Sequence, residues 1–104
     1  MSEKNTQDAC LELLSAKKVF HWRNNTGETK TASGGYVRYG YPGSPDIIAV
    51  IKGKFVGIEV KSIKGKLSDN QELFKIMLEL SGGDYHVVRS IDQLIQILND
   101  NYGI

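Results

Sequence analysis

The chain has 104 residues, of which 40% are hydrophobic and 24% are charged, so it has the length of one compact domain, residues 1–104, and the composition of a folded protein. Its single cysteine, Cys10, excludes an intramolecular disulfide and a cysteine-based zinc site, and it favours a reducing compartment. No apolar run approaches the ~20 residues of a membrane span, and the first five residues form no signal-peptide pattern, so we expect a cytoplasmic protein without a membrane partner.

The net charge of +1 conceals an uneven distribution of charge along the chain. Residues 1–66 hold eleven Lys and Arg against six Asp and Glu, whereas residues 67–104 hold two against six. The first part is therefore net +5 and the second part net −4. A basic region of this kind suits a phosphate backbone, although an unevenly charged solvated surface would give the same counts.

The N-terminal region is expected to form a helix over about residues 3–18, where apolar residues recur at helical spacing and Gly and Pro are missing. Residues 19–23 are expected to follow as a half-buried strand. In this strand Phe20 and Trp22 alternate with polar residues, which is the period of a β-strand.

Residues 24–44 show no periodicity and are rich in Gly, Thr, Ser and Asn. A loop of about twenty residues in so small a domain is usually functional or mobile. Tyr36, Arg38, Tyr39 and Tyr41 combine aromatic and basic groups, as nucleic-acid surfaces often do. A glycine-rich hairpin with packed tyrosines is the other interpretation, and the sequence does not separate the two.

The rest of the chain alternates between strand and helix patterns. Two strands, at 46–51 and 54–62, are joined across a Lys-Gly pair as a tight hairpin. A helix at 73–80, a strand at 85–89 and a helix at 91–98 follow. The order αβββαβα predicts an α/β fold with a mixed central sheet flanked by helices.

Charged residues interrupt the apolar pattern at the open end of the expected hairpin. Glu59 and Lys61 are two residues apart and so share one face of their strand, and Gly57 is expected to leave space on that face for another molecule. Asp46 begins the preceding strand, so the hairpin would bring its carboxylate toward that of Glu59. Two carboxylates this close stay ionised together only with a cation between them.

Two carboxylates, the Val60 carbonyl and waters form an all-oxygen environment that suits Mg²⁺ or Mn²⁺ and not zinc. Lys61, beside such an ion, is placed to orient an attacking water and to stabilise charge on a phosphoryl oxygen. These groups suffice for hydrolysis of a phosphodiester. A surface Glu-Lys strand with Asp46 capping a turn would give the same pattern, so the residue types alone leave both interpretations open.

Four short segments, taken in order, resemble the motif series of a known nuclease family. They are WRNNTG at 22–27, GSPD at 43–46, EVK at 59–61 and LSDNQ at 67–71. The series is similar to that of the virus-type replication-repair nuclease (VRR-NUC) family, in the stand-alone form found in phages, within the PD-(D/E)xK nuclease superfamily. The resemblance implies a restriction-endonuclease-like core and a metal-dependent endonuclease that acts on DNA.

The resemblance also implies roles for individual residues. Asp46 and Glu59 would bind the metal ion, and Lys61 would assist the chemistry. The acidic residue that the family carries on its first helix best matches Glu3, and Glu12 is the competing candidate. Both acids lie on the expected first helix.

Gln71 matches the conserved glutamine that the resemblance implies for the site. It also completes a capping box, in which Ser68 caps the helix and the glutamine reaches back to it. Gln71 therefore has a catalytic and a structural interpretation. The basic side chains expected to contact nucleic acid are Arg23, Lys30, Arg38, Lys64 and Lys66.

The resemblance implies DNA as the partner, with branched structures such as four-way junctions as the substrate, and a homodimer for symmetric cutting. The protein would act in the host cytoplasm if it is phage-encoded. Two alternatives remain: a DNA-binding module that kept the nuclease fold, and a restriction-type endonuclease that reads bases through residues 26–41. His21 and His86 are expected to be strand residues, because neither has a further ligand at metal-binding spacing.

Overall fold

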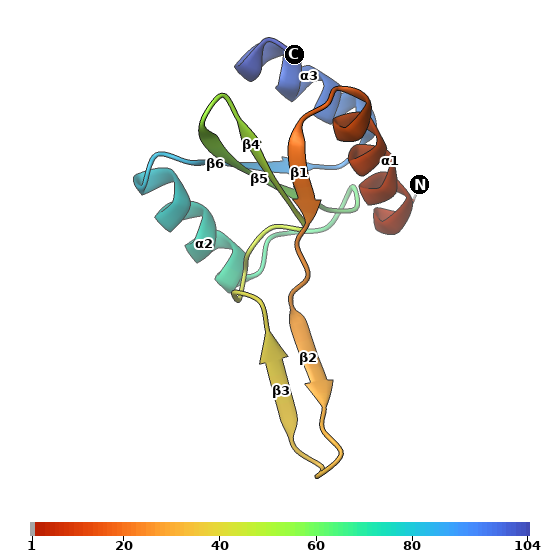
Figure 1. Cartoon of the computed structure of the whole chain (residues 1–104), viewed down its shortest axis with the longest axis vertical. Coiled ribbons are helices and arrows are strands. Elements are labelled where there is room, and N and C mark those ends of the chain that lie inside the picture. Colours follow the sequence, from red (N-terminus) through yellow and green to blue (C-terminus); the bar gives the residue numbers. More distant parts are fainter. Residues whose placement is uncertain (1) are drawn as a thin grey trace.

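The computed structural model of the protein describes residues 2–104 and combines one central sheet with a separate hairpin and three helices (Figure 1). In chain order the elements are α1 (Glu3–Ala16), β1 (Phe20–Arg23), β2 (Gly27–Lys30), β3 (Tyr36–Tyr39), β4 (Ile47–Ile51), β5 (Lys54–Val60), α2 (Asp69–Leu80), β6 (Asp84–Val88) and α3 (Ile91–Tyr102).

The central sheet has the order β1-β4-β5-β6 and is mixed, as predicted. Strands β1, β4 and β5 are antiparallel neighbours, whereas β6 pairs with β5 in parallel after the crossover through α2. The turn between β4 and β5 has positive φ at both Lys52 (53°) and Gly53 (80°), which is the geometry that a two-residue hairpin of matching twist requires. The expected β4–β5 hairpin is therefore confirmed.

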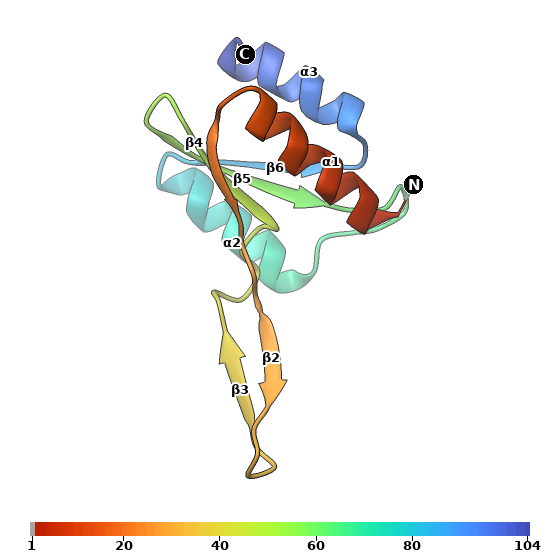
Figure 2. The same cartoon turned by 45° about the vertical axis from the view of Figure 1, so that its right-hand side comes forward.

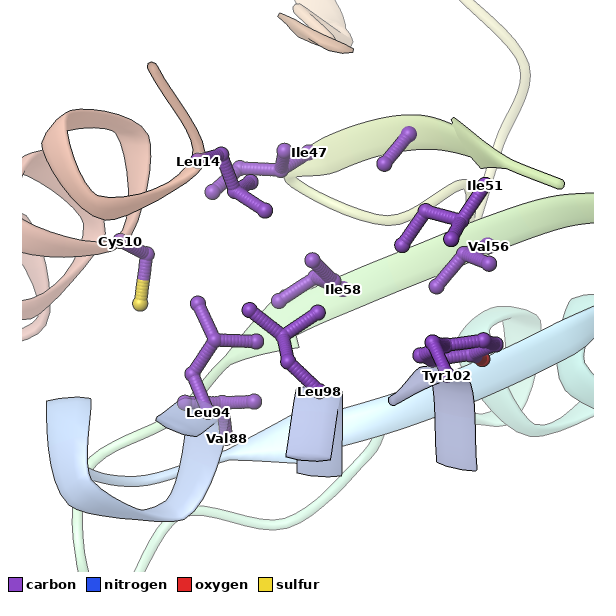
Figure 3. Packing of buried hydrophobic residues seen from close by; sticks show 11 residues of the cluster. Cys10, Leu14, Ile47, Ile51, Val56, Ile58, Val88, Leu94, Leu98 and Tyr102 are labelled. Carbon is purple, nitrogen blue, oxygen red and sulfur yellow. The ribbon is translucent and has the colours of Figure 1, made fainter. Parts of the chain in front are cut away.

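The hydrophobic core lies between the sheet and the pair α1 and α3, whereas α2 lies on the opposite face (Figure 2). Cys10 and Leu14 of α1 and Leu94 and Leu98 of α3 are fully buried. They meet the inward side chains of β4 and β5, including Ile58 (Figure 3). No helix among residues 2–104 is long and apolar enough to span a membrane.

The aromatic side of β1 does not face this core, contrary to the expectation of a half-buried strand. Phe20 is 69% exposed and Trp22 is 42% exposed. The core side instead carries His21, whose Nδ1 donates to the Val19 carbonyl at 2.7 Å. The alternation was correct, but it did not show which side of the strand would be covered.

Residues 24–44 form a β2–β3 hairpin rather than an irregular loop, so the element order gains two strands relative to the prediction. Its tyrosines are not packed in a core, since Tyr36 is 66% exposed and Tyr39 is 48% exposed. The ring of Tyr39 lies over Gly27, where a Cβ would come within 2.6 Å of the Tyr39 hydroxyl. Glycine at this position is what lets the ring cover the backbone of the opposite strand.

A polar network closes the end of the core at the C-terminus of α3. Tyr102 donates its hydroxyl proton to Asp84 at 2.5 Å, and His86 Nε2 lies 2.7 Å from the same hydroxyl oxygen. Lys54 pairs with the other oxygen of Asp84 at 3.0 Å. Burial lowers the pKa of His86, so the ring is a neutral donor to the tyrosine oxygen, and both histidines have structural partners within the described chain.

Replacing Tyr102 with phenylalanine is expected to lower the free energy of unfolding by about 1–2 kcal/mol, because it leaves His86 and Asp84 without their shared partner. Urea denaturation followed by circular dichroism measures the change. The matched control is Tyr36→Phe, on the exposed hairpin, which should leave stability unchanged. Equal stability of the two variants would show that the network does not hold α3 in place.

Candidate metal-binding and catalytic site

Asp46 and Glu59 meet where β4 begins and β5 ends. The last ladder pair is Ile47 opposite Ile58, and continuing this register by one residue places Asp46 opposite Glu59. Asp46 Oδ2 accepts a hydrogen bond of 2.8 Å from the Val60 backbone N–H. This bond fixes the Asp46 carboxylate against the end of β5, beside the other two expected metal ligands, Glu59 and Val60.

Glu59 is almost completely buried, with 3% of its surface exposed. Its Oε2 accepts from Gln71 Nε2 at 3.1 Å and lies 3.6 Å from Lys61 Nζ. Its Oε1 is buried and has no hydrogen-bond partner among the described residues. An oxygen in this position costs free energy unless another group satisfies it.

The pKa of Glu59 is raised to about 8. Burial is the largest cause, and the neighbouring Asp46 carboxylate adds to it, while Lys61 opposes both. The Tyr85 hydroxyl, buried beside the pair, also has its pKa raised by burial and then by the two carboxylates, so it stays neutral. Without a cation, the Asp46–Glu59 pair therefore holds a proton at neutral pH.

Gln71 caps α2 and also contacts the buried Glu59. The side-chain Oε1 of Gln71 accepts a hydrogen bond from the Ser68 backbone N–H at 2.9 Å. The backbone N–H of Gln71 donates to the Ser68 hydroxyl at 3.2 Å. These two bonds are the capping box of α2. The side-chain Nε2 of Gln71 donates to Glu59. The same side chain therefore caps the helix and contacts the buried acid.

Glu3 lies beside the site, whereas Glu12 does not. A cleft of about 270 Å³ is lined by Glu3, Arg23, Asp46 and Val60 together with Lys4 and Gln7 of α1. A second cleft of about 290 Å³ carries Glu3 and Lys61 on its walls. Neither cleft includes Glu12, which is exposed further along α1. Of the two candidate acids on α1, Glu3 is therefore the one that lies next to Asp46.

The residues at this point fit a hard divalent cation. Among residues 2–104, no group of three or more His, Cys, Asp or Glu side chains is arranged to hold a metal. Mg²⁺ needs only one or two carboxylates and keeps several waters. The unpartnered Glu59 Oε1, the Asp46 carboxylate and the Val60 carbonyl supply oxygen donors of the kind it prefers.

Gly57 does not leave the open space that the sequence suggested. A Cβ at this position would come within 2.7 Å of the Pro45 ring. The proline ring fills the room on this face, so the residue before Asp46 packs directly on the strand that carries Glu59. The glycine therefore serves the close approach of the two strand ends and not the entry of a ligand.

Arg89 is part of the surroundings of the site, although no sequence motif marks it. Its Nη1 lies 2.5 Å from the Ser62 carbonyl and 2.7 Å from the Gly65 carbonyl, with the Ile63 carbonyl at 3.4 Å. These three carbonyls belong to the turn that directly follows Lys61. Arg89 follows β6, so a contact across 24 to 27 residues could be found only from the fold.

Replacing Arg89 with alanine is expected to weaken DNA binding about tenfold, because the turn that carries Lys64 and Lys66 loses its shared donor. Fluorescence anisotropy with labelled DNA measures the affinity, and added guanidinium should restore part of it. Lys75→Ala, which removes an exposed pair with Glu79, is the control. Unchanged DNA affinity in Arg89→Ala would show that the contacts of Arg89 with this turn do not contribute to DNA binding.

The five basic residues expected to contact nucleic acid fall in three places. Arg23 lines the cleft with Asp46. Lys64 and Lys66 are exposed on the segment between β5 and α2, and Lys30 and Arg38 are exposed on the β2–β3 hairpin. They do not form one cluster, because the β2–β3 hairpin extends away from the central sheet (Figure 1).

Comparison with known proteins agrees with this fold. The model of the VRR-NUC domain family matches residues 1–92. A solved structure described as a VRR_NUC domain is 19% identical, with a TM-score of 0.71, and the match covers 96% of this chain and 97% of that chain; at this identity the likeness concerns the fold. No curated protein matches the chain. Because the family model spans most of its length, the chain belongs to the VRR-NUC family and is of nuclease type.

Proposed function

We propose that this protein is a metal-dependent DNA endonuclease of the PD-(D/E)xK type. The observation that carries the proposal is the buried Glu59 beside Asp46, with one carboxylate oxygen unpartnered and Lys61 3.6 Å from the other. A purely structural acid would be expected to have both oxygens satisfied or to remain in solvent. Family membership and the oxygen-donor set support the same conclusion.

In the proposed reaction, water adds to phosphorus and one P–O ester bond breaks. Asp46, Glu59 and the Val60 carbonyl would hold Mg²⁺ or Mn²⁺, which supplies Lewis-acid stabilisation of charge on the phosphoryl oxygens when bound. Lys61 donates to the attacking water or to a phosphoryl oxygen, and its ammonium is held in place by Glu59. The attacking water loses one proton to Glu3 or to solvent, and the leaving ester oxygen takes up one proton from solvent as the bond breaks.

Gln71 and Glu3 are proposed to support the chemistry from either side. Gln71 fixes the rotamer of Glu59 while it caps α2, so the acid cannot turn away from the site. Glu3 faces both clefts next to the site and can accept a proton from a water that approaches from the α1 side. Neither residue needs to bind the ion directly.

Glu3→Gln is expected to reduce the cleavage rate at saturating DNA by about 100-fold, which is the lower end of the usual range for loss of a proton-accepting group. Glu12→Gln is the matched control, since it changes the same residue type on the same helix away from the clefts. Single-turnover rates with labelled DNA measure the difference. If Glu12→Gln causes the larger loss, the first-helix acid has been placed wrongly.

Branched DNA, such as a four-way junction, is the proposed substrate, and it requires two copies of the chain for symmetric cutting. Helix α2 buries no residue completely within its own chain, and its apolar side chains are left for a partner. Strand β1 carries two exposed aromatic residues on the same face of the sheet. The exposed apolar side chains are Leu73, Ile76, Met77 and Leu80 on α2 and Phe20 and Trp22 on β1; the two groups are separate, because α2 packs on β6 and β1 is the opposite edge of the sheet. Sedimentation that shows only monomer at working concentrations would count against symmetric cutting.

Two other functions share this fold. A DNA-binding module without catalysis would have no reason to keep Lys61 and Gln71 on a buried acid. A restriction-type enzyme would read bases through the β2–β3 hairpin and would therefore cut linear DNA at one sequence. Incubation with labelled linear, flapped and four-way DNA separates these outcomes. We expect metal-dependent cuts near the branch point, whereas cuts at a fixed sequence in linear DNA would favour the restriction-type enzyme.

A further inference from the structure

The β2–β3 hairpin projects from the domain as an arm, defined here as residues 25–43. Figures 1 and 2 show it extending along the long axis of the molecule, away from α1, α3 and the central sheet. The molecule measures 49 Å along that axis and 32 and 27 Å across it. Apart from Thr31, every residue of β2, β3 and the connecting turn is exposed. A lone two-stranded hairpin of this kind gains little stability in water by itself.

The base of the arm is fixed to the catalytic strands. Asn24 Nδ2 donates to the Ser44 hydroxyl at 2.8 Å and to the Pro45 carbonyl at 3.0 Å, and the Asn24 N–H donates to the Asp46 carbonyl at 2.7 Å. The arm therefore leaves the domain directly beside Asp46, and its direction relative to the site is held by these three bonds.

A second contact ties the returning strand to α2. Gly43 has φ of +81°, and a Cβ there would come within 2.2 Å of the Asn70 carbonyl oxygen. The chain thus passes against the N-terminal turn of α2, one residue before the Gln71 that holds Glu59. These contacts join the base of the arm to β4 on one side and to α2 on the other.

The two faces of the arm differ in chemistry. Cross-strand partners lie on the same face, so the pairs Glu28–Arg38 and Lys30–Tyr36 form one face, and the pairs Gly27–Tyr39 and Thr29–Val37 form the other. The first face carries two cations against one anion and an exposed phenol. Arginine, lysine and tyrosine side chains are among those that contact phosphates.

We infer that the arm lies along duplex DNA next to the cut, and that Lys30, Tyr36 and Arg38 contact the phosphate backbone of that DNA. The inference rests on the proposed nuclease function and deepens it, because it makes duplex flanking the cut part of the substrate. A two-stranded ribbon fits the major groove of B-DNA. Nine residues from the clamp at Asn24 to the tip reach roughly 30 Å, which corresponds to about nine base pairs.

The test compares binding of four-way DNA with arms of about 5 or about 15 base pairs, which lie below and above the reach of the arm. The proteins are wild type, a Lys30→Ser/Tyr36→Ser/Arg38→Ser variant, and a Thr29→Ser/Val37→Ser control on the opposite face. Anisotropy is read with Ca²⁺ in place of Mg²⁺, and cleavage is read separately with Mg²⁺.

Wild type and control should bind the long-armed DNA about tenfold more tightly than the short-armed DNA, whereas the triple variant should bind both alike. The slope of the logarithm of binding affinity against the logarithm of salt concentration should decrease for the triple variant by the amount expected for about two lost phosphate contacts. A triple variant that keeps the length preference overturns the inference, as does one that only loses dimer in sedimentation. If wild type shows length-dependent binding but no cleavage, the proposed function is overturned, whereas the inference that the arm contacts duplex DNA is supported.

Discussion

Replacing Asp46 with alanine is expected to lower metal-dependent DNA cleavage by about 1,000-fold or more. The substitution removes one of the two carboxylates that would hold the ion, and a bound ion contributes several kcal/mol to the transition state, at about 1.4 kcal/mol for each factor of ten. Lys61→Ala should have an effect of the same kind, because it removes the cation beside Glu59. Single-turnover cleavage of labelled four-way DNA measures both variants.

The control for this loss is Asp46→Asn, which keeps an oxygen to accept from the Val60 N–H. It should fold with near-normal stability and yet be as inactive as Asp46→Ala, because the amide carries no charge. Circular dichroism and thermal unfolding report the fold. Cleavage by Asp46→Asn at the wild-type rate would mean that this carboxylate takes no part in the reaction.

The stability of the metal-free protein is expected to fall as pH rises from about 5 to 8, because Glu59 is protonated in the folded state and ionised in the unfolded chain over that range. Its pKa is raised to about 8, from an ordinary value of 4.5. The contribution of protonated Glu59 to the free energy of unfolding is thus complete below the pKa of this residue in the unfolded chain. It is lost as the pH rises through the pKa of this residue in the folded protein. The loss should be about 2–4 kcal/mol, measured by urea denaturation in chelator.

Glu59→Gln is the matched variant for this measurement, since glutamine keeps the shape and cannot titrate. Its unfolding free energy should be nearly independent of pH over the same range, apart from effects shared with wild type. At pH 8, Mg²⁺ should raise the melting temperature of wild type and leave that of Glu59→Gln unchanged, because the ion favours the ionised acid. Parallel pH profiles for the two proteins would contradict the burial of a protonated Glu59.

The parts of the site that the sequence predicted are those set by local geometry. The Lys52-Gly53 turn and the alternation along β5 sufficed to bring Asp46 and Glu59 together and to place Lys61 on the same face. The LSDNQ segment likewise predicted the cap of α2 through Ser68. Each of these features depends on neighbours within a few residues, or across one tight hairpin, and so can be predicted from the sequence pattern alone.

The parts that the sequence did not predict depend on contacts between distant segments. The burial of Glu59 arises from its neighbours in the fold, with Gln71 brought across by α2, whereas a strand pattern shows only which side chains alternate. The tether from Arg89 and the clamp by Asn24 join segments about 20 or more residues apart. The sequence left the hairpin of the arm as one of two interpretations, because its four-residue strands bury no apolar face, and without burial no period of two appears.

The most direct test of the central claim is cleavage of labelled four-way and linear DNA by wild type and Asp46→Asn, each with Mg²⁺, with Mn²⁺ and with chelator. The account predicts that wild type cuts with either metal, that chelator stops the reaction, and that Asp46→Asn is inactive throughout. Absence of cleavage by wild type on every DNA with both metals, or cleavage that persists in chelator, would contradict a metal-dependent site at Asp46 and Glu59.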